Sequence, residues 1–192
     1  MVTGDDGIAD FPGIPPGGYD IDVRLDSGDA LVDSARSHIG STSWAYWRAR
    51  SPYPADTNKC NLFVYEMANG VGRTVPRRTR WSWRQGREVW YPPLAGEWGD
   101  AGTPVGSWTV VSDPLPGDVI AEPHFYIDAT GHVGIVSYPL PNGESRSLAA
   151  GEHITTTVEL PRQTVSAGGD DIMENNWGWR QGQTPTFRRY SP

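Results

Sequence analysis

Apolar residues recur at helical spacing in two segments of the first half of the chain. The first segment, residues 30–39, follows the cap-forming residues Ser27 and Asp29 and stops at Gly40. A capping residue before the segment and a glycine after it are typical start and stop signals of a helix. The residues expected to face the core are Leu31, Ala35, His38 and Ile39.

The second helical segment begins near Cys60, the only cysteine of the chain. Thr57 and Asn58 precede it as N-cap residues, and Gly70 provides a stop signal. The pattern therefore places the thiol at the N-terminus of a helix. The apolar residues that recur at helical spacing are Leu62, Phe63 and Met67.

From Trp108 onwards, short runs of β-branched and aromatic residues alternate with turn residues, which is typical of strands. Residues 129–131 suit a hairpin turn, and residues 114–118 form another turn. Helices followed by strands predict an α+β fold with helices first and an antiparallel sheet after them. The predicted strands are residues 108–112, 119–121, 125–128, 132–138, 153–160 and 172–177.

Charge and composition divide the chain into two parts. Residues 1–29 are rich in Gly, Pro and Asp, and their seven aspartates and one arginine give a net charge of −6 out of −7 for the whole chain. We interpret residues 1–29 as an acidic leader or tether, or else as a strap across the body, and residues 30–192 as one domain. The nearly neutral body lacks the basic stripe that nucleic-acid binding requires.

The chain has no run of about eighteen apolar residues, and its start lacks the basic and apolar stretches of a secretory signal. A single cysteine cannot form an internal disulfide, so folding does not depend on an oxidising compartment. One cysteine and four scattered histidines offer no metal-ligand spacing, and we expect neither a metal nor another cofactor.

Cys60 is the candidate nucleophile. A thiol at a helix N-terminus lies beside free N–H groups and the positive end of the helix dipole, and both favour the reactive thiolate. A buried, inert cysteine is the alternative. A nucleophilic cysteine also needs a base, and the base needs a third group that fixes its tautomer.

His132 is the candidate base because it opens a predicted strand directly after a glycine. It shares a strand face with Gly134, which leaves space above the sheet for a substrate or for the cysteine helix. Glu174 and Asn176 are two residues apart, so on a strand they point to the same side. Either of them could orient the imidazole.

Basic and aromatic residues interleave in residues 73–87. Such interleaving occurs on single-stranded nucleic-acid platforms. The lack of basic surface elsewhere favours instead an Arg-bearing helix or loop on a sugar- or peptide-binding wall. The candidate substrate-binding residues are Trp44, Tyr46, Tyr53, Trp81 and Trp83.

Five motifs occur in a recognisable order: Cys60 at a helix start, PRRT at residues 76–79, LPGDVI at residues 115–120, GHVGIV at residues 131–136 and ENNW at residues 174–177. Over about residues 30–179, the chain resembles papain-like cysteine peptidases of the NlpC/P60 and CHAP group, which cleave peptidoglycan stem peptides or crosslinks. Lys59 and Asn61 stand where the group usually has Asp and Ser. A lysine ammonium close to the thiol would favour the thiolate.

The resemblance implies a papain-like fold in which Cys60 is the nucleophile and its backbone N–H helps to bind the oxyanion. It implies that His132 is base and acid, and that Glu174 or Asn176 orients it. The aromatic residue that precedes the cysteine in the group would be Trp44, Tyr46 or Tyr53.

Because no secretory signal is present, the resemblance implies delivery to the periplasm or cell wall by another route. The chain is similar to peptidoglycan amidase effectors of type VI secretion, which would have a cognate immunity protein, or it is a phage lysin released through a holin. Two alternatives stay open. One is a papain-like acyltransferase, deamidase or protease toxin acting on a protein, and the other is a non-catalytic, aromatic-rich wall-binding module.

Overall fold

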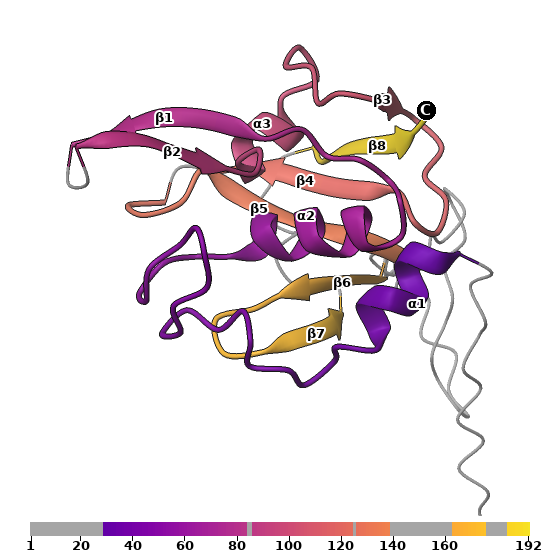
Figure 1. The fold of residues 1–192 in the computed structure, drawn as a ribbon. Helices are drawn as coiled ribbons and strands as arrows, with labels where there is room; N and C mark the ends of the chain where they lie inside the picture. Colours follow the sequence, from indigo (N-terminus) through magenta and orange to yellow (C-terminus); the bar gives the residue numbers. More distant parts are fainter. Residues whose placement is uncertain (1–28, 84–85, 125, 139–162, 176–183) are drawn as a thin grey trace, which may run out of the picture.

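The computed structural model describes residues 29–83, 86–124, 126–138, 163–175 and 184–192, and the statements below concern those residues (Figure 1). The helices are α1 (Ala30–Arg36), α2 (Cys60–Gly70) and α3 (Ala95–Gly99). The strands are β1 (Arg78–Ser82), β2 (Arg87–Tyr91), β3 (Trp108–Val111), β4 (Val119–Pro123), β5 (Gly131–Tyr138), β6 (Gln163–Ala167), β7 (Ile172–Asn175) and β8 (Thr186–Tyr190).

Six strands form one antiparallel sheet in the order β3-β8-β4-β5-β6-β7, and β1 and β2 form a separate antiparallel hairpin. Figure 1 shows α2 lying along the middle of the sheet and the hairpin projecting beyond it, on the side where α2 begins. The predicted α+β class with an antiparallel sheet is confirmed. Among the described helices, none is long and apolar enough to cross a membrane.

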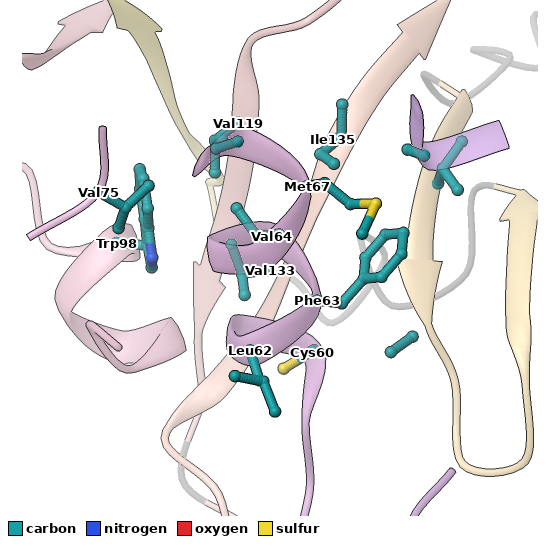
Figure 2. Close-up of a cluster of buried hydrophobic side chains, with 14 of the residues drawn as sticks. Cys60, Leu62, Phe63, Val64, Met67, Val75, Trp98, Val119, Val133 and Ile135 are labelled. Carbon is teal, nitrogen blue, oxygen red and sulfur yellow. The ribbon is translucent and has the colours of Figure 1, made fainter. Parts of the chain in front are cut away.

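The apolar side of α2 forms the centre of the core (Figure 2). Leu62, Phe63 and Val64 are fully buried and belong to one cluster with Val133 and Ile135 of β5. Burying side chains of this size contributes roughly 1.5–3 kcal/mol each. This burial explains why the segment forms a helix and why its first residue, Cys60, is held against the sheet.

α1 is shorter than the predicted helix because the chain leaves it to pair with β7. Asp29 caps the helix as predicted, by accepting hydrogen bonds from two backbone N–H groups. Beyond α1, the Gly40 N–H donates to the Ile172 carbonyl at 2.8 Å, and the Ile172 N–H donates to the Ser41 carbonyl at 3.1 Å. Ile39, predicted to face the core, is consequently 49% exposed.

The strands β3, β4, β5 and β7 confirm four of the predicted strands. Residues 126–128 do not form the predicted strand, because β4 continues to Pro123 and pairs directly with β5, with Glu122 opposite His132. Residues 78–82 and 87–91, interpreted in part as a helix or loop, form the β1–β2 hairpin instead. The sequence did not predict α3, β6 or β8, and the predicted strand at residues 153–160 lies outside the described residues.

The turn at residues 116–118 is hydrogen-bonded to β8. Gly117 has a φ of +85°, a conformation that favours glycine, and a Cβ there would collide with the carboxylate of Asp29. The carboxylate of Asp118 accepts a hydrogen bond from Arg189 Nη2 of β8 at 2.8 Å. The conspicuous PGD sequence therefore has a structural role at the start of β4.

Candidate active site

The thiol of Cys60 is the first side chain of α2 and contacts the sheet. Burial raises its pKa, while backbone hydrogen bonds from Val133, Asn61 and Cys60 itself lower it by less. A position at a helix N-terminus predicts a thiolate, but desolvation has the larger effect in this fold. The structure therefore favours the neutral thiol, which is 7% exposed.

The Cys60 thiol lies at the edge of β5, at a position where a neighbouring strand would otherwise pair. The register between β5 and β6 begins at Ile135, so Val133 lies before the stretch of β5 that pairs with β6. The Val136 N–H donates to the Asp118 carbonyl on the β4 side. Because N–H groups alternate in direction along a strand, the Val133 N–H points to the β6 side, toward the Cys60 sulfur, whose pKa it lowers.

His132 precedes Val133 on β5, and strand alternation directs its ring to the face of the sheet away from α2. Its Nε2 lies 3.1 Å from the hydroxyl oxygen of Ser166 on β6. Burial lowers the pKa of His132 to about 4, so the imidazole is neutral at pH 7. The structure therefore places the thiol and the imidazole on opposite faces of β5 and does not bring these two predicted groups into contact.

Glu174, predicted as a group that could orient His132, lies on the other face of the sheet. It is directly opposite Val165 on β6, and Val165 belongs to the core cluster under α2. Ser166, the next residue along β6, points to the opposite face and reaches His132. The structure therefore does not bring Glu174 to the imidazole.

The carboxylate of Glu174 instead pairs with α1. Arg36 Nη2 lies 2.7 Å from Glu174 Oε1, and Arg36 Nε lies 3.1 Å from both oxygens. Burial raises the pKa of Glu174, but the hydrogen bonds and the charge of Arg36 outweigh it and hold the pKa below its usual range. The other predicted orienting group, Asn176, lies outside the described residues.

Lys59 occupies the N-cap position of α2 without capping it. The predicted caps are wrong: Thr57 makes no side-chain cap bond, and Asn58 Nδ2 donates to Asp128 of the β4–β5 loop at 3.1 Å. The Lys59 ammonium is 2% exposed and is surrounded by backbone carbonyls rather than directed at the thiol. It donates to the carbonyls of Ala45 (3.2 Å), Tyr46 (3.1 Å) and Thr57 (2.7 Å).

Tyr53 is held beside Cys60 by the helix residue that follows the cysteine. Asn61 Nδ2 donates to the Tyr53 hydroxyl at 2.7 Å, and also to the carbonyls of Pro92 (3.3 Å) and Pro93 (3.2 Å). Burial raises the pKa of Tyr53 to about 12, and the proximity of Cys60 adds to the increase. Of the three aromatic residues left open by the sequence, Tyr53 is the one that the structure places against the candidate nucleophile.

The other two aromatic residues of the loop before α2 have different surroundings. The Tyr46 hydroxyl hydrogen-bonds to Asp128, which raises the Tyr46 pKa together with desolvation, the larger cause. Trp44 is 3% exposed, donates from Nε1 to Glu66 at 2.9 Å and lies under the guanidinium of Arg50. Trp44, predicted to contact substrate, is therefore a core residue.

Trp81 and Trp83 lie on the β1–β2 hairpin and its turn, away from the core. They are 52% and 90% exposed and contact each other edge to face, with ring centroids 6.1 Å apart. Their exposure is what a binding surface requires. Of the predicted substrate-binding residues, these two therefore remain open to a ligand.

No sequence motif points to Ser166. It lies in β6, whose sequence QTVSA alternates polar and apolar residues and could have been taken as a strand. Only the pairing of β5 with β6 brings Ser166 to His132. Among the described residues, no group of three or more His, Cys, Asp or Glu side chains is arranged to hold a metal ion.

Comparisons of the chain with protein-family models, with curated proteins and with solved structures find no match.

Proposed function

We propose that the protein is a cysteine amidase or endopeptidase that cleaves amide bonds in the stem peptides or crosslinks of peptidoglycan. The observation that carries this proposal is the arrangement at the start of β5. Cys60 lies beside Val133 of β5, and the preceding residue, His132, bonds to Ser166 on the opposite face of that strand. The candidate nucleophile is thereby held against the strand that carries the candidate base.

The protonation states suggest how the two groups work together. Burial favours the neutral thiol and the neutral imidazole. The proposed reaction therefore requires the His132 side chain to reach the thiol side of β5, where it takes the thiol proton while the sulfur attacks the carbonyl carbon.

The remaining steps follow from the same groups. The new carbon–sulfur bond places negative charge on the carbonyl oxygen, which the backbone N–H of Cys60 at the start of α2 stabilises. The carbon–nitrogen bond then breaks, and His132 returns its proton to the leaving amine. Water, deprotonated by His132, attacks the thioester and regenerates the thiol.

The substrate class comes from the sequence resemblance, and the surface chemistry is compatible with it. The exposed rings of Trp81 and Trp83 offer apolar faces on which sugar rings or peptide groups can pack. They lie on a hairpin that extends past the start of α2 (Figure 1).

Digestion of purified sacculi tests the proposal. Wild-type protein should release muropeptides whose masses identify the cleaved bond, and Cys60→Ala should lower the rate by more than about a thousandfold. His132→Gln should cause a similar loss. His38→Gln is the matched control, because His38 packs edge to face on Trp44 and has no role in the mechanism.

Two results would contradict the proposal. One is an identical muropeptide profile from the wild type and Cys60→Ala. The other is sacculi that remain intact while a protein substrate is cleaved or deamidated in a Cys60-dependent reaction, which would support the protein-directed alternative. Binding to sacculi without any product would support a wall-binding module.

A further inference from the structure

The β1–β2 hairpin has two chemically different faces. In its register, Arg78 is opposite Tyr91, Arg80 is opposite Val89, and Ser82 is opposite Arg87. Since paired residues and every second residue share a face, all three arginines lie on one face. The other face carries Thr79 with Trp90 and Trp81 with Glu88.

The arginine-bearing face is continuous with the surroundings of Cys60. Asn61, which follows the cysteine, donates to the carbonyls of Pro92 and Pro93, the two residues directly after β2. The last residue of β2 is Tyr91, and the Arg80 guanidinium lies 5.2 Å from the centroid of its ring. A short chain of contacts therefore leads from the thiol to Arg80.

The pKa of Tyr53 is affected by both Cys60 and Arg80, which supports the placement of Arg80 near the thiol. The pKa of this buried phenol is raised mainly by burial and further by Cys60 and Tyr91, while Arg80 lowers it. Tyr53 therefore lies within electrostatic range of the thiol on one side and of the hairpin arginine on the other.

Arg80 differs from its neighbours in its contacts. Arg78 pairs with Glu97 at 3.3 Å and donates to the Pro104 carbonyl at 2.7 Å. Arg77 donates to the Tyr65 hydroxyl at 2.8 Å. Arg80 is exposed, and within the described part of the chain its guanidinium has the ring of Tyr91 as neighbour but no carboxylate.

The hairpin is also a basic region in an acidic chain. Residues 77–91 contain five arginines and one glutamate, a net charge of +4, whereas the whole chain carries −7. An exposed guanidinium stacked on an aromatic ring keeps its in-plane N–H groups available for a carboxylate, which it can bind in a bidentate manner.

We propose that Arg80 binds a free carboxylate of the peptide that is cleaved at Cys60, with Tyr91 holding the guanidinium in place. This inference rests on the proposed function, because it assigns a specificity-determining residue to the same site. Peptidoglycan stem peptides fit this chemistry, since they carry carboxylates that do not take part in the chain of amide bonds.

The test compares two synthetic stem peptides that differ only in whether their side carboxylates are free or amidated. Binding is measured calorimetrically with the full-length Cys60→Ala protein, and hydrolysis with the active protein. We expect the free-carboxylate peptide to bind at least about tenfold more tightly than the amidated one. Arg80→Gln should remove this preference and leave the amidated peptide unaffected, and Arg80→Lys should restore part of it.

Arg77→Gln is the matched control, because it removes the same charge from the same hairpin without changing the arginine-bearing face. Equal affinity for the two peptides, or a preference that survives Arg80→Gln, would overturn the inference even if both peptides are hydrolysed. An Arg80-dependent preference without hydrolysis would support the carboxylate site and contradict the proposed function. The carboxylate site and the proposed function are therefore contradicted by different results.

Discussion

The loop before α2 and the β1–β2 hairpin use the same kinds of residues in opposite ways. Lys59 and Trp44 in the loop are 2% and 3% exposed, and their polar atoms are bonded to protein groups. Trp81 and Trp83 on the hairpin are 52% and 90% exposed. In the loop, cationic and aromatic side chains position the start of α2, whereas on the hairpin they are available to a ligand.

This difference predicts where substitutions affect stability and where they affect binding. The loop, α2 and β5 form one buried unit around Cys60, so a change there leaves polar groups unsatisfied or charges buried. The hairpin contributes little to the core. Three experiments test this distinction, and they follow in order of decreasing expected effect.

The largest effect is expected from protonation of His132. Because its folded pKa of about 4 lies below the ordinary imidazole value of 6.5, the unfolded chain binds a proton more readily. Stability should therefore fall as pH decreases through this window, by about 3 kcal/mol between pH 7 and pH 4 from this group alone. Urea unfolding at several pH values should show a smaller decrease for His132→Gln, and equal slopes for both proteins would contradict the prediction.

A second experiment compares two cations, one from each region. Lys59→Met removes the ammonium that three backbone carbonyls share, two of which also accept a backbone N–H, and should lower the free energy of unfolding by about 2 kcal/mol. Arg80→Met, on the exposed hairpin, should change it by less than about 0.5 kcal/mol. Similar losses for the two variants, measured by urea unfolding at pH 7, would show that the hairpin is as important for stability as the loop.

The third experiment separates the two faces of the sheet. Glu174→Gln weakens the pair with Arg36 and should lower the free energy of unfolding by about 1 kcal/mol at pH 7, with little change in kcat/KM. Because the pKa of Glu174 is lowered in the folded state, this difference should disappear as pH falls through that pKa.

Ser166→Ala is the comparison on the other face. It should lower kcat/KM about tenfold, mainly through kcat, because His132 loses the hydroxyl that holds its ring. A shift of the acidic limb of the pH–rate profile would accompany this loss if Ser166 acts through the imidazole. A larger activity loss in Glu174→Gln than in Ser166→Ala would reverse the roles given to the two residues.

The sequence predicted the elements whose patterns are local and strong. The spacing of Leu62, Phe63 and Met67 located α2, and the run at residues 131–136 located β5. It missed β6 and β8, which are short, and it treated the hairpin as a helix or loop because polar and aromatic residues on both of its faces hide the strand pattern.

For the candidate site, the sequence shows which reactive side chains are present: one thiol at the start of a helix and a histidine at the start of a strand. The protonation state and the partners of these side chains depend on the tertiary structure. Desolvation, which depends on what covers Cys60, outweighs the local effect of the helix N-terminus on its pKa. The partner of His132 depends on which strand pairs beside β5, and that pairing places Ser166 at the imidazole and turns Glu174 toward α1.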